Sequence, residues 1–306
     1  MIALGGNALL RRGQPLEADL QWQNVKVAAS AIAELIREGH EVIICHGNGP
    51  QVGLLALQSE AYEEVRSYPL DVLDAESQSM IGYMLQQSLH NELPDKEVVT
   101  IVTQVEVNSS DPAFQKPTKF IGPTYSKDQA ERLALEYGWT VKVDLDSVRR
   151  VVPSPHPKSI IEIDTITTLL DAGIITICGG GGGIPVIKNN GKLSGIEGVI
   201  DKDRTAALIA EKIQADALII LTDVDGIYED YRNPKQQQIK QASVVALEAT
   251  EFPAGSMGPK VEAACLFVTN TGGISAIGSL SNLLGIVNKE SGTHITSNAQ
   301  ETTYYS

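Results

Sequence analysis

The chain has 306 residues, of which 42% are hydrophobic and 20% are charged, a composition typical of a globular protein with a large buried core. It carries 24 basic against 38 acidic residues, a formal charge of −14, which argues against a broad nucleic-acid surface and against binding to anionic membranes. Any anion site must therefore gather its lysines locally.

Apolar runs alternate with helical periodicity through the first part of the chain. A strand at 1–4 precedes a helix whose apolar positions run from Val25 to Ile36, and a strand at 41–46 follows the break at Gly39. The next predicted elements are helices at about 51–66 and 78–92, a strand at 98–104, a helix at about 164–171 and a strand at 174–178. This alternation predicts a mostly parallel sheet between layers of helices.

A second α/β block follows. Its predicted elements are a helix at about 204–214, a strand at 217–222, a helix at about 260–269 and a strand at 274–278. Between the two blocks, residues 108–157 break the rhythm with short mixed segments and six prolines, at positions 112, 117, 123, 153, 155 and 157. This stretch predicts an inserted hairpin or a small subdomain.

Cysteine and histidine spacing gives no sign of a disulfide or a metal site. Cys45, Cys178 and Cys265 lie far apart without a CxxC pair, which is typical of small core residues in a reducing compartment. The five histidines show no metal-ligand spacing. No apolar stretch reaches membrane-spanning length and the amino terminus opens without a charged leader. We therefore expect a cytoplasmic protein with no metal-ligating residues.

Three glycine-rich turns each follow a short apolar run. They lie at residues 5–7, 47–49 and 179–183. Glycine at the end of a buried strand lets backbone N–H groups approach an anion, and a helix starting there adds its positive end. The turns predict one extended phosphate site, although tight strand-to-helix packing alone would also explain any single turn.

Two common phosphate motifs are excluded by spacing. A P-loop needs Gly-Lys-Ser/Thr, which none of the turns supplies, and the stretch from Gly47 to Gly53 misses the dinucleotide fingerprint by one residue.

Three lysines are candidates to stabilise a transferred phosphoryl group. Lys202, with Asp203 beside it, and Lys260 both stand where a helix is predicted to begin, and Lys119 lies in the proline-rich insert. Each alone is equally typical of a solvated surface lysine. Together with the glycine turns they suffice for phosphoryl transfer, and an oxyanion acceptor would need no histidine base.

The chain resembles the carbamate kinases of the amino-acid kinase family over nearly its whole length. The resemblance rests on an ordered set of stretches: 3–9, 46–53, Pro117-Thr118-Lys119 with 121–123, 149–155, 180–185, 199–203, and Gly255-Ser256-Met257 with Pro259-Lys260. It implies an open αβα sandwich with a mostly parallel central sheet and a small protruding subdomain.

In domain terms, the resemblance implies a single domain over 1–306. Its amino-terminal lobe (1–177) would hold carbamoyl phosphate and carry the subdomain at about 108–157, and its carboxyl-terminal lobe (178–306) would hold the nucleotide. Members of the family form homodimers and interconvert ADP and carbamoyl phosphate with ATP and carbamate, using Mg²⁺.

The resemblance also implies roles for individual residues. Lys119, Lys202 and Lys260 would act on the carbamoyl and phosphoryl groups, with Asp203 orienting lysines. The substrate-binding residues would be Gly5, Gly6, Asn7, Gly47, Asn48 and Gly49. The nucleotide-binding residues would be Gly180, Gly181, Thr222, Asp223, Tyr228, Met257 and Lys260.

The sequence departs from the family pattern in three places. The first strand is short, the stretch from Asp144 to Val148 has an aspartate near where an arginine is expected, and the tail at 299–306 has no assigned role. We expect catabolic ATP formation, because carbamoyl phosphate is a high-energy mixed anhydride and carbamate is unstable. Two alternatives stay open: a kinase of another small carboxylate or amino acid, and a non-catalytic nucleotide-binding regulator.

Overall fold

The computed structural model describes residues 1–6, 9–10, 13–144, 146–231, 233–252, 257–299 and 301–305. Within these residues the largest sheet is built from β1 (Ile2–Leu4), β2 (Ile43–His46), β3 (Val98–Thr100), β9 (Ile175–Ile177), β12 (Ala217–Thr222), β13 (Tyr228–Glu229), β14 (Gln237–Ser243), β15 (Ile274–Ser279), β16 (Thr293–Thr296) and β17 (Thr303–Tyr304). The strand order is β13-β14-β16-β15-β12-β1-β2-β9-β3, with β17 paired to β14.

The centre of this sheet is parallel, as the sequence predicts. Neighbouring strands from β15 through β12, β1, β2 and β9 to β3 all run in the same direction, while β16 runs antiparallel to β15. Because side chains alternate across a strand, Ile2 and Leu4 enter one hydrophobic core and Ala3 enters the other.

Helices cover both faces of the sheet. Their bounds are α1 (Ala18–Arg37), α2 (Gly49–Glu60), α3 (Leu70–Glu92), α4 (Lys127–Tyr137), α5 (Ile163–Asp171), α6 (Lys202–Lys212), α7 (Val244–Glu248), α8 (Gly258–Thr271) and α9 (Leu283–Val287), with short 3₁₀ turns at Pro112–Phe114, Gly180–Gly182 and Leu280–Asn282. Helices α1, α3 and α9 supply side chains to the first core, and α6 and α8 supply the second. The predicted αβα sandwich is confirmed.

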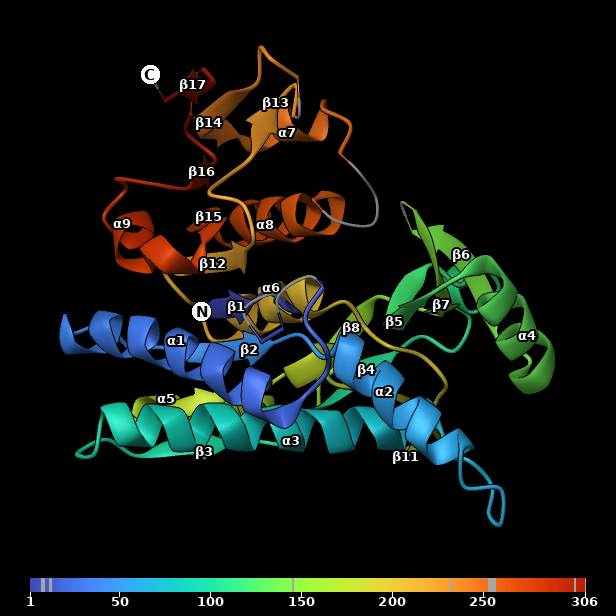
Figure 1. Cartoon of the computed structure of the whole chain (residues 1–306). Helices are drawn as coiled ribbons and strands as arrows, with labels where there is room; N and C mark the ends of the chain where they lie inside the picture. The colour runs from blue at the N-terminus through green and yellow to red at the C-terminus, as the bar shows by residue number, and fades with distance from the viewer. Residues whose placement is uncertain are drawn as a thin grey trace.

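Two smaller sheets flank the main one. One has the order β11-β10-β4-β8, from β4 (Gln104–Val107), β8 (Pro157–Ile160), β10 (Ile184–Asn189) and β11 (Lys192–Gly195). The other, which we call the side sheet, has the order β5-β7-β6, from β5 (Lys119–Tyr125), β6 (Thr140–Asp144) and β7 (Ser147–Val152). Figure 1 shows the side sheet and α4 standing to one side of the main body.

One predicted strand and two predicted helix boundaries were wrong. The apolar run at 98–104 is divided between β3 in the main sheet and β4 in a flanking sheet. The chain leaves the main sheet after Thr100, and the next residues lead into β4, where Thr103 is buried and bonded to Gln78. Sheet membership is set by distant partners, so a continuous apolar run does not reveal it.

Helix α2 ends at Glu60 instead of about 66, and α3 begins at Leu70 instead of about 78. Tyr62 and Val65 are more than half exposed, so no packing stabilises a continuation of α2. Leu70 and Leu73 are buried in a core formed with Val52, but the buried polar residues of this first part of α3 obscure its periodicity. None of the described helices has both the length and the hydropathy to cross a bilayer.

Candidate active site

The start of helix α6 carries three consecutive charged residues that are buried. Asp201, Lys202 and Asp203 are 7%, 7% and 2% exposed. Asp201 caps the helix, since its Oδ1 accepts a hydrogen bond from the backbone N–H of Asp203 at 2.9 Å. Buried charges are costly unless they are paired, and each of these three has an ionic partner.

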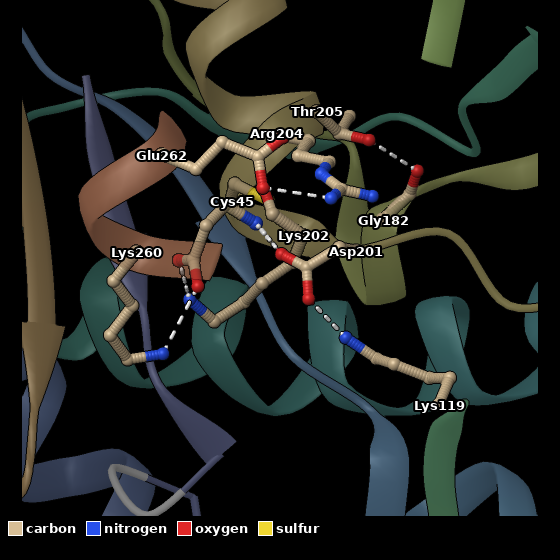
Figure 2. Close-up of polar contacts among 10 residues, drawn as sticks. Cys45, Lys119, Gly182, Asp201, Lys202, Arg204, Thr205, Lys260 and Glu262 are labelled. Carbon is tan, nitrogen blue, oxygen red and sulfur yellow. Dashed lines mark hydrogen bonds and ion pairs between the residues drawn. The ribbon is translucent and has the colours of Figure 1, made fainter. Parts of the chain in front are cut away.

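The partners bring together three lysines from distant parts of the chain. Lys202 pairs with Asp203 and Lys119, the first residue of β5, pairs with Asp201. Lys260, from the first turn of α8, lies with its Nζ 3.0 Å from Asp203 Oδ2. Figure 2 shows these contacts in one place. We call Lys119, Asp201, Lys202, Asp203 and Lys260 the charge cluster.

Burial and mutual interaction act in opposite directions on the pKa values of Asp203 and Lys260. Burial raises the pKa of Asp203, but Lys202 and Lys260 outweigh it and hold the pKa below its usual value. Burial lowers the pKa of Lys202. For Lys260 burial acts in the same way, yet Asp203 and Asp201 raise the pKa above its usual value. In the ion pairs of the charge cluster three lysines share two aspartates, an arrangement that favours an entering anion.

The first two glycine turns meet at Lys202. They follow the adjacent parallel strands β1 and β2, so they lie at the same edge of the sheet. A Cβ added to Gly47 would lie 3.3 Å from Lys202 Cδ and 3.5 Å from the backbone N of Gly6, and one added to Gly5 would lie 2.6 Å from the carbonyl oxygen of Leu221. Backbone thus closely approaches a lysine side chain here.

Two more of the predicted substrate-binding residues lie at the start of α2. Gly49 is the first residue of this helix, and Asn48 precedes it at the N-cap position. Asn7 lies outside the described residues, as do Gly255 and Ser256 of the stretch before Lys260.

Helix α3 contacts the second glycine turn through hydrogen bonds to Asn48. Asn48 is 2% exposed and donates hydrogen bonds from its amide nitrogen to Asp74 Oδ1 and Ser77 Oγ, each at 2.8 Å. Burial raises the pKa of Asp74 well above its usual value, although the hydrogen bond from Asn48 acts in the opposite direction. The amide of Asn48 is thereby fixed in orientation at the edge of the site.

The third glycine turn is buried beneath the second. A Cβ on Gly180 would lie 2.4 Å from His46 Nε2, and one on Gly181 would lie 2.3 Å from Asn48 Nδ2. Gly182 accepts a hydrogen bond from Thr205 Oγ1 of α6 at 2.7 Å. These contacts show close packing between the two turns and α6, and the role of Gly180 and Gly181 in nucleotide binding stays a prediction.

The remaining predicted nucleotide residues lie around the end of β12 and the start of α8. Thr222 Oγ1 donates to Asp223 Oδ1 at 3.1 Å, and Met257, just before α8, packs against the second core. Tyr228 donates to Asp225 Oδ1 at 2.6 Å. Within the described residues no hydrogen bond or ion pair joins Tyr228 to the charge cluster.

Sequence reasoning assigned no role to Asp201. Its signal was present, because aspartate directly before a helix is a favoured N-cap residue, but its ion pair joins residues 82 positions apart and is not visible in the sequence. Asp144, in the stretch that departs from the family pattern, pairs with a residue of the neighbouring strand. Asp144 Oδ2 lies 3.2 Å from Arg149 Nη1, and Arg149 donates to the carbonyl oxygen of Gly122 at 2.9 Å.

Comparison with known proteins identifies the family of the chain. The model of the amino acid kinase family matches residues 1–277. The chain therefore belongs to the amino acid kinase family.

Within that family the chain is similar to carbamate kinases along its whole length, as the sequence motifs predicted. The carbamate kinase of Haemophilus influenzae is 52% identical over 307 residues, which span 100% of this chain and 99% of the relative. The structure of carbamate kinase from Giardia lamblia bound to citric acid superposes with a TM-score of 0.92 at 39% identity, covering 96% of this chain and 97% of that one. The same enzyme bound to AMP-PNP gives 0.87 at 40% identity, with 96% and 97% coverage.

Proposed function

We propose that this chain is a carbamate kinase that transfers a phosphoryl group reversibly between carbamoyl phosphate and ADP, giving ATP and carbamate. The observation that carries the proposal is the charge cluster, in which Lys119, Lys202 and Lys260 converge beside two glycine turns. Full-length similarity to carbamate kinases supports it independently.

The proposed chemistry depends on position and charge. Backbone N–H groups of the turns at Gly5–Gly6 and Gly47–Gly49 would hold the phosphoryl oxygens, with Lys202 and Lys260 opposing the charge that spreads over them in the transition state. Lys119 would contact the carbamoyl end. Carbamate is already an oxyanion, so no base is needed. His46 fits this account, since burial lowers its pKa to about 4 and keeps it neutral.

We propose that the adenine nucleotide binds on the carboxyl-terminal side, at Thr222, Asp223, Tyr228, Met257 and Lys260. The turn at Gly180–Gly181 would also contribute to nucleotide binding. The AMP-PNP complex of the Giardia lamblia enzyme supports nucleotide binding by this fold.

Mg²⁺ would accompany the nucleotide and neutralise phosphate charge. The described residues contain no cluster of three metal-ligating side chains, and Asp201 and Asp203 are already paired with lysines. The donor set therefore suits a Mg²⁺ ion held mainly by phosphate oxygens and water.

Assembly and location are further parts of the proposal. We expect a homodimer in the cytoplasm, where the three free and buried cysteines would stay reduced. Light scattering of the purified protein should give twice the mass of the 32.8 kDa chain, and a monomer at micromolar concentration would contradict the homodimer.

The test is a coupled assay of ATP formation with purified protein, ADP and Mg²⁺. Carbamoyl phosphate and acetyl phosphate are compared as donors at equal concentration. We expect ATP formation with carbamoyl phosphate to exceed that with acetyl phosphate by a wide margin. Activity with acetyl phosphate alone would favour a kinase of another small carboxylate, and activity with neither donor would favour a nucleotide-binding regulator.

A further inference from the structure

The three lysines of the charge cluster come from two parts of the fold, the helices on the main sheet and the side sheet. Lys202 and Lys260 lie in the first turns of α6 and α8, whose apolar faces pack on the main sheet. Lys119 is the first residue of β5 in the side sheet. Its side chain is also more exposed, at 26% compared with 8% for Lys202 and 17% for Lys260.

Three kinds of contact attach the side sheet to the main body near Lys119. The first is close backbone packing between α2 and β5: a Cβ on Gly53 would lie 2.0 Å from Gly122 Cα, and one on Gly49 would lie 3.6 Å from the carbonyl oxygen of Phe120. The second is a buried apolar cluster in which Ile121 of β5 and Val152 of β7 pack with residues of the main body: Val52, Leu70, Leu73 and Val199. The third is the ion pair between Lys119 and Asp201. Of these three contacts, the ion pair is the one made by the lysine side chain itself.

Asp201 uses its two carboxylate oxygens for separate tasks. Oδ1 accepts the capping hydrogen bond from the backbone N–H of Asp203, and Oδ2 binds Lys119. The Asp201 side chain is 10% exposed and that of Lys119 is 26% exposed, so water screens the attraction within this pair less than in a fully exposed ion pair. Without the Asp201 charge, Lys119 would approach Lys202 and Lys260 without its own ion-pair partner to offset their mutual repulsion.

We propose that Asp201 is a positioning residue that holds the Lys119 ammonium group and the near edge of the side sheet at the charge cluster, ready for the anionic substrate. This inference rests on the proposed carbamate kinase function for its kinetic consequence. It does not rest on that function for its structural consequence, which concerns how firmly β5 is held against α2 and α6.

The kinetic test uses Asp201→Asn, because asparagine caps a helix as well as aspartate does and the variant loses only the charge. We expect kcat/KM for carbamoyl phosphate to fall about tenfold or more, while KM for ADP changes less than twofold. In a Lys119→Met background, Asp201→Asn should cause no further loss. An equal loss in both backgrounds would show that Asp201 acts without Lys119 and would overturn the inference.

The structural test measures amide hydrogen exchange at residues 119–122 and at the first turn of α2. Asp201→Asn should speed exchange at both by about tenfold, since an equal loss of pairing energy raises the open population by that factor. Unchanged exchange would overturn the inference. A wild-type protein that makes no ATP from carbamoyl phosphate would contradict the proposed function alone, because the exchange measurement still decides the role of Asp201.

Glu106→Gln is the matched control for both tests. It makes the same carboxylate-to-amide change and breaks the ion pair with Lys158, which is 64% exposed and belongs to β8 of a flanking sheet. We expect this variant to match the wild type in kinetics and in exchange at β5. A comparable effect from Glu106→Gln would show that the assays report general loosening, which would also overturn the inference.

Discussion

Lys202 and Lys260 enter the charge cluster from helices packed on the main sheet, whereas Lys119 enters it from the side sheet. The first two share Asp203, a carboxylate that is only 2% exposed. Lys119 depends on Asp201, on close backbone contact between α2 and β5, and on the apolar cluster that Ile121 and Val152 form with α2 and α3. The fold thus places two of the cations on helices of the main body and the third on the side sheet, which suits a group that must let substrate enter and leave.

Substitutions at Lys202, Asp203 and Lys260, the part of the cluster held by the main body, should have the largest effects on stability and activity. Asp203→Ala leaves two buried ammonium groups without their shared partner, so we expect a loss of about 3–5 kcal/mol in the free energy of unfolding and about a 10³-fold fall in kcat. Chemical denaturation and the ATP-formation assay measure these effects. Glu262→Ala is the control, because it breaks the partly exposed pair with Arg204 on the same two helices. Equal effects from the two variants would contradict the comparison.

Acid should destabilise the fold through His46, which is fully buried at the end of β2. Burial lowers the pKa of this histidine to about 4, below its usual value of about 6.5. Its contribution to stability is therefore fully present above pH 6.5 and is lost as the pH falls to about 4, by about 3 kcal/mol.

Denaturation at several pH values tests this prediction with two variants. His46→Gln should remove this part of the acid sensitivity, while His156→Gln, at an exposed position, should keep it. An unchanged pH slope in His46→Gln would show that the histidine does not titrate differently in the folded state.

Substitution of Lys119, the lysine that the side sheet carries, should affect catalysis more than stability. Lys119→Ala removes a charge that is 26% exposed and leaves Asp201, which is 10% exposed, without its ion-pair partner. We expect about a 10²-fold fall in kcat and a loss of about 1–3 kcal/mol in stability, less than for Asp203→Ala. Calorimetric titration should show ADP affinity within twofold of the wild type. Unchanged turnover would remove Lys119 from the mechanism, and a large loss of ADP affinity would place it on the nucleotide side.

Close packing between α2 and β5 gives the smallest predicted effect on catalysis. Gly53→Ala places a Cβ where it meets the backbone of Gly122, so the side sheet must shift away. We expect a cost of about 1–3 kcal/mol in stability and about a tenfold fall in kcat/KM for carbamoyl phosphate. Gln58→Ala, at an exposed position of α2, is the control. Wild-type kinetics in Gly53→Ala would show that this interface does not position Lys119.

The sequence predicted the parts of the site that are local in character. Glycine turns after apolar runs and lysines at helix starts leave clear patterns, and β1 and β2 bring two of the turns together because they are adjacent parallel strands. The lysines could be identified as candidates, but their convergence was carried by the family resemblance and by the structure. Their partners come from elements separated by many residues.

Contacts between distant segments account for what was missed. The ion pair of Asp201 with Lys119 and the glycine contact between Gly53 and Gly122 both join the side sheet to the main body, and neither has a local signal. The buried Asp74 lies on a part of α3 whose polar residues concealed the helix. Polar groups buried for a site break the apolar periodicity from which helices are predicted.

Three ammonium groups on separate elements are proposed to act together on one carbamoyl phosphate, Lys202 and Lys260 on the phosphoryl group and Lys119 on the carbamoyl end. The most direct measurement is the initial rate of ATP formation from carbamoyl phosphate and ADP by the wild type and by Lys119→Met, Lys202→Met and Lys260→Met. We expect an active wild type and a fall of at least about 10²-fold in each variant. A wild-type rate in any one of the three, in a protein shown to be folded, would contradict the claim.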